Sequence, residues 1–310
     1  MLLRVFRRLI VVCGLALVAV MWLRVAAWAQ QLEPRAYSPA PIDVNFAGLT
    51  FLHASGGAAL DASLPVKNTH VEIEALAAYY QRTFDLLGHQ ASFGMALPYA
   101  WVSGKATVQG RATTAQRSGP GDPAFRFATN LIGGPALTSE EFARQTPTTS
   151  LGTSLTMVAP FGQYFDNRLL NIGSNRWSFK PELGLSQPVG PWQLELSGGS
   201  WFFTDNDHYF RRSHREQDPI VTTQAHVGYT FRPGLWIAAD ATYYTGGRTT
   251  VNGIRNDDRQ EATRIGLTLT LPIAEGYSLR LAWSDTVATR INGSEFTTYM
   301  ATFQYTWFDR

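Results

Sequence analysis

The chain has 310 residues, with 26 basic and 24 acidic side chains, six histidines and one cysteine. A formal net charge of +2 at pH 7 gives a nucleic-acid partner no electrostatic support. After residue 29, no apolar stretch has the length of a membrane-spanning helix, so helices cannot be the way in which this protein meets a bilayer.

The first 29 residues have the layout of an exported signal peptide. Three arginines precede an apolar run at residues 9–23, and Ala27-Trp28-Ala29 has the small-x-small pattern of a cleavage site. The run has fifteen residues, fewer than a spanning helix needs, so we expect cleavage before Gln30, with a retained anchor as the alternative. Cleavage removes four arginines and Cys13, which leaves 22 basic against 24 acidic residues. The processed chain then has no thiol for a disulfide, thiolate catalysis or a cysteine metal site.

Residues 30–41 are expected to form a periplasmic N-terminal segment, and residues 42–310 divide into runs of period two. Successive side chains of a strand point to opposite faces, so such runs predict strands with one apolar face. The first run changes phase near Ala47-Gly48, which predicts a β-bulge. The twelve predicted strands are residues 42–53, 70–84, 89–103, 121–132, 149–163, 176–188, 192–204, 220–231, 235–247, 262–272, 277–287 and 297–308.

The connections between these runs alternate between long and short, which favours a membrane barrel over a soluble sandwich. Bacterial outer-membrane barrels have an even strand number, short periplasmic turns, longer external loops and an apolar outer face. We therefore predict an all-β protein, a single antiparallel transmembrane β-barrel of about twelve strands, with both termini in the periplasm. One connection on the short side is long, and its Thr138 and Glu141 have capping-box spacing, which predicts a short periplasmic helix within residues 133–148.

Aromatic residues gather near the ends of the predicted strands, as the interfacial girdles of an outer-membrane barrel would. In the last run, Phe303 and Trp307 belong to an aromatic face that we expect to meet lipid. The ladder stops at Trp307, a departure from the aromatic C-terminal residue usual in such barrels. The predicted girdle residues are Tyr99, Trp101, Trp177, Trp192, Trp201, Tyr229, Tyr243, Trp283, Tyr305 and Trp307.

The charged residues on the polar face are candidates for lining the lumen. They are Glu72, Glu74, Glu182, Glu195 and Asp240, with Arg126, Arg176, Lys180, Arg264 and Arg280. Five acids against five bases give little net field, so strong ion selectivity is not expected. Two interpretations stay open: a structural network of paired charges, or a charge-lined pathway for a polar or weakly amphipathic solute.

The predicted external loops contain a second group of candidates. Asp205, Asp207 and His208 stand together in one long connection, and Asp257-Asp258 stand in the next. Carboxylates beside a histidine could activate a water, as in an outer-membrane hydrolase, or hold a divalent cation. The simpler interpretation is a solvated loop that touches lipopolysaccharide through Arg211, Arg212 and Arg215, and we predict no metal site and no catalytic residue.

Four segments spread over the chain carry a family resemblance. They are "LEPRAYSPAPIDVNF" from Leu32, "GDPAFRFATNLIGGPAL" from Gly121, "GSNRWSFKPELGLS" from Gly173 and "FRPGLWIAADATYYTGGRTTVNGIRNDDRQ" from Phe231. In these segments the chain resembles the outer-membrane proteins labelled "putative MetA-pathway of phenol degradation". The resemblance implies a single-chain barrel that transports small compounds, aromatic ones among them, and it implies no particular functional residues.

Together these observations predict a channel or transporter of the Gram-negative outer membrane, not an enzyme, that passes small solutes without a cofactor. Its expected partners are the lipid bilayer, lipopolysaccharide, the outer-membrane assembly machinery and a small-molecule solute, with no nucleic acid. The alternatives are a barrel hydrolase that uses the loop aspartates or His208, and a structural or adhesive barrel.

Overall fold

The computed structural model describes residues 33–57, 66–108, 111–168, 170–290 and 294–309. The predicted signal peptide lies outside these ranges, so its cleavage stays a prediction. Among the described residues, no helix is both long and apolar enough to cross a bilayer.

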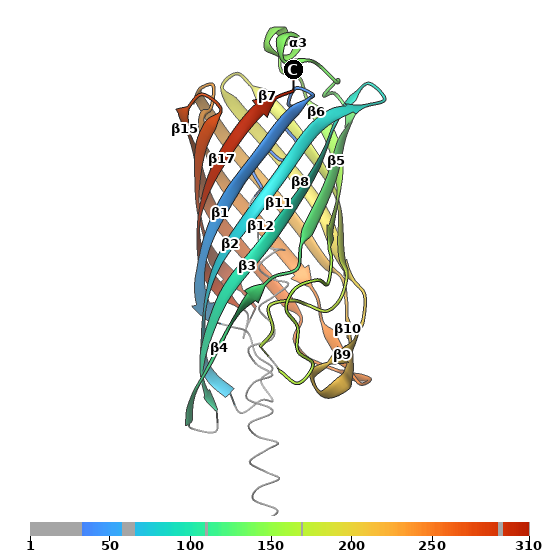
Figure 1. Cartoon of the computed structure of the whole chain (residues 1–310), viewed down its shortest axis with the longest axis vertical. Coiled ribbons are helices and arrows are strands. Elements are labelled where there is room, and N and C mark those ends of the chain that lie inside the picture. Colours follow the sequence, from blue (N-terminus) through green and yellow to red (C-terminus); the bar gives the residue numbers. More distant parts are fainter. Residues whose placement is uncertain (1–32, 58–65, 109–110, 169, 291–293, 310) are drawn as a thin grey trace, which may run out of the picture.

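The described chain is mostly antiparallel strand, as Figure 1 shows. The elements are β1 (Val44–Gly57), β2 (Val66–Leu86), β3 (His89–Val108), β4 (Arg111–Pro120), β5 (Ala124–Ile132), α3 (Ser139–Arg144), β6 (Ser150–Val158), β7 (Ser178–Val189), β8 (Trp192–Phe203), β9 (Asn206–Tyr209), η2 (Phe210–Arg212), β10 (Ser213–Gln217), β11 (Ile220–Arg232), β12 (Leu235–Gly246), β13 (Thr249–Val251), β14 (Ile254–Arg255), β15 (Gln260–Ala274), β16 (Tyr277–Thr289) and β17 (Glu295–Phe308).

The strands close into one twelve-stranded antiparallel barrel, which confirms the predicted fold class. The hydrogen-bonded order is β2-β1-β17-β16-β15-β12-β11-β8-β7-β6-β5-β3-β4, and β2 also pairs with β3. The first and last strands are neighbours over the whole of β1, from Val44↔Phe308 to Gly57↔Glu295. Closure pairs backbone N–H and C=O groups within the sheet, which is the condition for strands that lie in hydrocarbon.

One barrel strand is divided into β4 and β5. β5 pairs with the first part of β3, and β4 pairs with the later part, from Tyr99↔Pro120 to Val108↔Arg111. The sequence predicts this strand only from residue 121 and predicts a loop at the residues of β4. Most β4 side chains are exposed on both faces, so β4 has no apolar alternation by which it could be predicted.

The two ends of the barrel differ, as predicted. The start of β1, the C-terminus, α3 and the short turns lie at one end, here called the short-turn end (Figure 1). At the turn between β2 and β3, Leu87 and Gly88 have φ values of 54° and 84°, as a two-residue type I′ hairpin turn requires. In α3, Thr138 and Glu141 form both bonds of the capping box, which confirms the predicted helix.

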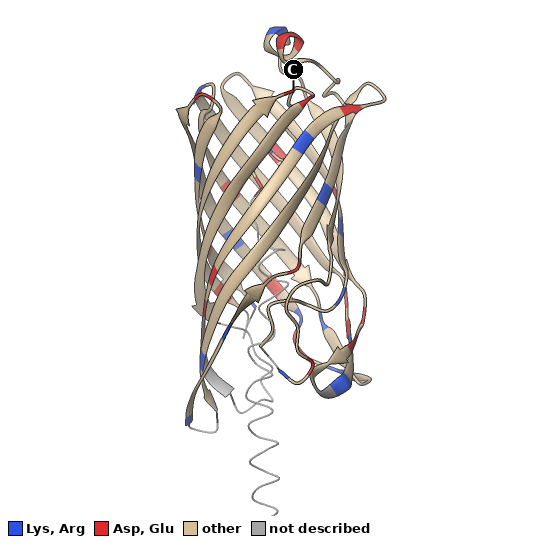
Figure 2. Ribbon diagram, in the orientation of Figure 1, with Lys and Arg blue, Asp and Glu red and all other residues tan. Residues whose placement is uncertain are grey.

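The opposite end, the long-loop end, carries the long connections. Two of these form a separate four-stranded sheet of order β14-β13-β10-β9. Charged residues are frequent around β9 and β10 (Figure 2). The assignment of the short-turn end to the periplasm stays a prediction.

Large apolar side chains cover the outside of the barrel. Leu267 is 49 % exposed and Phe303 is 46 % exposed, whereas two packed sheets would bury both. Near the short-turn end, the rings of Tyr305 and Trp307 stack with their centres 5.4 Å apart. A soluble monomer rarely exposes so large a continuous apolar surface, whereas an outer-membrane barrel requires one to meet lipid. Trp201 departs from the predicted girdle, because it points inward and is 2 % exposed.

The bulge predicted near Ala47-Gly48 is absent, because β1 keeps a continuous register with both of its neighbours. A Cβ at Gly48 would overlap the backbone oxygen of Phe303 and lie 2.7 Å from the Tyr79 ring, so the glycine makes room for the neighbouring strand and for this ring on the inner face. The change of phase in the sequence therefore reflects packing inside the barrel.

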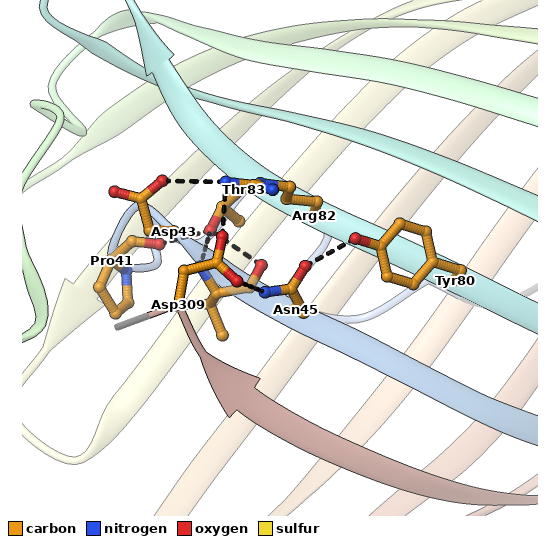
Figure 3. A network of polar contacts seen from close by, with 8 residues as sticks. Pro41, Asp43, Asn45, Tyr80, Arg82, Thr83 and Asp309 are labelled. Carbon is orange, nitrogen blue, oxygen red and sulfur yellow. Dashed lines mark hydrogen bonds and ion pairs between the residues drawn. The ribbon is translucent and has the colours of Figure 1, made fainter.

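Polar contacts join the first and last strands at the short-turn end (Figure 3). Arg82 of β2 forms ion pairs with Asp309 at 2.5 Å and with Asp43 at 3.5 Å. The side-chain amide of Asn45 donates to Asp309 at 2.7 Å, and the hydroxyl of Tyr80 donates to Asn45 at 2.6 Å. These ion pairs and hydrogen bonds fix Asp309, which follows the aromatic ladder, to the first two strands.

Candidate functional site

The segment before β1 lies inside the barrel. Residues 33–41, here called the plug segment, contact the inner faces of β7, β8 and β12. The hydroxyl of Ser38 donates to Glu195 at 2.8 Å, and the guanidinium of Arg35 lies 4.6 Å from the centre of the Trp236 ring. The sequence predicts a periplasmic segment at residues 30–41, but residues 33–38 lie in the lumen, where they supply hydrogen bonds that the buried wall carboxylates require.

Tyr37 is a buried residue of the plug segment. It is 6 % exposed, and its hydroxyl donates to Glu182 at 2.8 Å and lies 2.8 Å from the hydroxyl of Ser154. Its ring occupies a recess in the wall made by Gly152 on β6 and Gly184 on β7. A Cβ at Gly152 would lie 2.7 Å from the ring, and a Cβ at Gly184 would overlap it. These two glycines therefore shape the wall for Tyr37.

A long connection closes part of the long-loop end. The carboxylate of Asp122 accepts hydrogen bonds from the backbone N–H groups of Gly162 (2.8 Å) and Ser174 (2.7 Å). Between these anchors, the side chain of Leu170 is buried in an apolar cluster with Val71 and Phe296. The connection is thereby held against the inner wall rather than extended into solvent.

A chamber of about 650 Å³ lies between the plug segment and this connection. Its lining residues on β1, β2 and β3 are mostly small or aliphatic: Leu52, Ala54, Ile73, Ala75, Ala77, Ala96, Ala100 and Val102. Lys180, Arg264 and Arg280 line it from β7, β15 and β16. The lumen is therefore only partly hydrophilic, with an apolar wall and a cationic wall, whereas the sequence predicts a lumen lined by the polar face of the strands.

Eight of the ten predicted lumen residues lie on the inner side, and two do not. Glu72 and Glu74 have 47 % and 57 % exposed side chains and lie on the outer face of β2, beside His70 and His53. The assignment of these two glutamates to the lumen was wrong. The polarity of β2 is reversed there because its inward residues, such as Val71, pack on the apolar cluster around Leu170.

The remaining eight differ in their contacts. Lys180 pairs with Glu182 at 3.1 Å, Arg126 lies 3.9 Å from Glu33, and Glu195 accepts a hydrogen bond from Ser186. The guanidinium of Arg176 lies 4.3 Å from the centre of the Phe203 ring. Arg264 donates to the hydroxyls of Ser284 and Thr298.

Asp240 belongs to a buried network that the sequence did not predict. Its carboxylate lies 2.7 Å from His226 Nδ1 and accepts a hydrogen bond from Thr268 at 2.7 Å. His226 stands in the polar phase of its strand, but its partner lies on a different strand. Glu33, Arg35 and Tyr37 were missed for a similar reason, since no sequence pattern shows that a segment without periodicity enters a barrel.

The loop candidates do not form one site. Asp257 pairs with Arg248 at 3.4 Å, and Asp258 accepts hydrogen bonds from the backbone N–H and the hydroxyl of Thr249. Burial raises the pKa of Asp258. The side chain of His208 is exposed and makes no ion pair with a described carboxylate.

A different histidine stands beside the other two candidate aspartates. His214 Nδ1 lies 2.7 Å from Asp207, and its Nε2 lies 3.1 Å from Glu216 and 3.7 Å from Asp205. The hydrogen bond with Asp207 raises the pKa of His214. Across the described residues, no group of three or more histidine, cysteine or acidic side chains could hold a metal ion.

The arginines proposed to contact lipopolysaccharide are not equivalent. Arg212 is exposed, whereas Arg215 is partly buried with its guanidinium 5.2 Å from the centre of the Tyr209 ring. The side chain of Arg211 lies outside the described part of the chain.

Comparison with known proteins places this fold among outer-membrane barrels. A sequence model of the family described as "Putative MetA-pathway of phenol degradation" matches residues 54–303. The COG4313 outer membrane channel from Pseudomonas putida F1 is 20 % identical with a TM-score of 0.77, over 89 % of this chain and all of that one. The beta domain of the Bordetella autotransporter BrkA is 11 % identical with a TM-score of 0.51, over 85 % of this chain and 99 % of that domain. No curated protein matches the sequence.

Proposed function

The chain belongs to the family described as "Putative MetA-pathway of phenol degradation", and on this premise we propose that it is an outer-membrane channel for small solutes, aromatic compounds among them. The luminal chamber of about 650 Å³ carries the proposal. Its size falls in the range of about 300–1,000 Å³ that small-molecule sites usually occupy. Its apolar wall offers a surface for a ring or alkyl group, and its cationic wall offers polar contacts.

Passage would require movement at both ends of the chamber. The plug segment narrows the short-turn end, and the connection around Leu170 narrows the long-loop end. The plug is held mainly by hydrogen bonds and by the Tyr37 ring, and its displacement would leave the barrel wall intact. We place the short-turn end in the periplasm and the long-loop end outside the cell, where Arg212 is available to lipopolysaccharide.

The proposed channel performs no chemistry. A hydrolase would need a nucleophile or an activated water near an orienting base, and His208 makes no ion pair with a described carboxylate. His214 is held by exposed carboxylates within its own loop sheet, an arrangement that stabilises a loop. The open chamber also argues against a purely structural or adhesive barrel, which needs no internal space.

Liposome swelling tests this proposal. Protein refolded into vesicles should admit small solutes of increasing size up to a sharp limit, and it should conduct in planar bilayers. Refolding is checked by the heat-dependent shift in gel mobility that intact barrels show. If a correctly folded barrel passes no solute and carries no current, the channel function is refuted while the fold stands.

A further inference from the structure

The charges that line the chamber are not balanced, although those of the whole lumen nearly are. Among the described lining residues, five are cationic (Arg35, Arg126, Lys180, Arg264 and Arg280) and two are acidic (Glu33 and Asp122). The Asp122 carboxylate is already engaged by Gly162 and Ser174. The chamber therefore presents a cationic surface, contrary to the small net field expected from the sequence.

The imbalance arises because the wall carboxylates are covered. Glu182 accepts a hydrogen bond from Tyr37 and forms an ion pair with Lys180, and Glu195 accepts a hydrogen bond from Ser38. Within the described part of the chain, neither carboxylate contributes to the lining of the chamber. The plug segment thus covers acidic groups of the wall. Lys180 stays paired with Glu182 and Arg126 lies near Glu33, whereas Arg280 lines the chamber without an ion pair to a described carboxylate.

Among these five cations, Arg280 has the fewest polar contacts with the described residues. It makes no ion pair or hydrogen bond with any described residue, and its Nε is buried without an acceptor. Its guanidinium lies 5.7 Å from the centre of the Trp236 ring, and Arg35 lies 4.6 Å from the same ring. A guanidinium over an aromatic ring keeps its hydrogen-bonding edge open, and that edge matches a carboxylate through two parallel hydrogen bonds.

The apolar wall continues from Arg280 around the barrel. One hydrogen-bonded row of the sheet runs from Arg280 through Thr302 and Thr50 to Ala77, which are neighbours in register on β16, β17, β1 and β2. Three strand spacings correspond to about 14 Å along the curved wall. The extended arginine side chain covers part of this distance, and a single-ring acid would cover the rest.

We propose that this chamber is a binding site for a small organic monoanion with an apolar ring, whose carboxylate pairs with Arg280 while the ring rests on the aliphatic wall of β1, β2 and β3. The proposal rests on the proposed channel function and narrows it to one class of solute. A cation is repelled by the lining charges, and a neutral ring compound leaves Arg280 without a partner.

Equilibrium dialysis of the folded protein in detergent tests the site without requiring transport. Four probes separate its features: benzoate, the neutral benzyl alcohol, the cationic benzylammonium, and acetate, which lacks the ring. Benzoate should bind about tenfold or more tightly than each of the others, because a charge-assisted hydrogen bond and ring burial each contribute at least this factor. Binding of benzyl alcohol or benzylammonium as tight as that of benzoate would overturn the proposal.

Two variants locate the site. Arg280→Met should weaken benzoate binding about tenfold or more. The matched control Arg144→Met removes an arginine whose side chain is 80 % exposed on α3 and should change nothing. If Arg280→Met failed to fold, the four probes on the unaltered protein would still decide the matter.

The two proposals can fail separately. Benzoate binding without any solute passage would leave the site standing and refute the channel. Passage of neutral solutes without preferential benzoate binding would leave the channel standing and refute the site.

Discussion

Replacing Gly184 by alanine should release the plug segment from the wall without touching the plug itself. The added Cβ would overlap the ring of Tyr37, which packs directly against Gly184 on the inner face of β7. Backbone atoms of a paired barrel strand cannot retreat far, so the ring must leave its recess. The two hydrogen bonds of its hydroxyl to Glu182 and Ser154 would be lost with it.

The size of this effect follows from what Tyr37 loses. Removing a buried aromatic side chain from its packing costs about 3–5 kcal/mol. The released hydroxyl regains hydrogen bonds to water, so we take the lower end, about 3 kcal/mol. That value shifts the ratio of docked to released plug by about a hundredfold.

Two measurements report the release. Single-channel conductance in planar bilayers should rise, because the lumen widens at the short-turn end. A cysteine introduced by Ser38→Cys should react with a maleimide about a hundredfold faster in the Gly184→Ala background, since its labelling follows the released population. Gly228→Ala is the matched control, because a Cβ at this position on β11 would lie at an ordinary 3.6 Å from its nearest neighbour.

Tyr37→Ala should act in the same direction without any steric clash. The contrary result is that both variants fold and still leave conductance and labelling at the level of Gly228→Ala. That result would refute the claim that the recess at Gly152 and Gly184 holds the plug segment in place.

Three further predictions concern the barrel and its loops. Asp309→Ala removes the ion pair with Arg82 and should lower the free energy of unfolding by about 1 kcal/mol, because the pair is partly exposed; an unchanged temperature of gel-mobility shift would contradict this. Lys180→Met leaves the Glu182 carboxylate buried without its cation and should cost about 3–5 kcal/mol in denaturant unfolding, whereas also replacing Glu182 by methionine should restore much of the loss. The folded protein raises the pKa of His214, so the stability that this histidine gives to the loop sheet is complete below the usual histidine pKa of 6.5 and is lost as the pH rises through the raised pKa. Limited proteolysis of this loop should therefore accelerate over that pH interval. The Asp207→Asn variant, which lacks the partner carboxylate, should not show this acceleration.

The barrel itself could be predicted because alternation is a local property. Side chains such as Leu267 and Thr268 point to opposite faces whatever their neighbours do, so twelve periodic runs and alternating connection lengths indicated an outer-membrane barrel. The helix α3 was predictable for the same reason, since a capping box involves residues only three positions apart.

The face of the barrel to which a polar side chain points was harder to predict from the sequence. Glu72 and Glu74 lie outside, because the inner face of β2 at this point packs on a folded connection. In β4, Ala115 packs against the buried apolar cluster, but most of its neighbours are exposed, so no apolar alternation reveals this strand. In both cases the deciding contact is made by a segment distant in the sequence.

The amino-acid sequence by itself determined a closed barrel with an apolar exterior, because contact with lipid imposes a period of two on the strands that span it. Only the tertiary structure decided what the lumen presents to a solute. Residues 33–41 have no periodicity, yet they enter the barrel, cover the carboxylates of one wall and leave Arg280 facing the chamber. The balance of charge in that space depends on which groups the plug segment covers, and such pairings across the lumen leave no repeat in the chain.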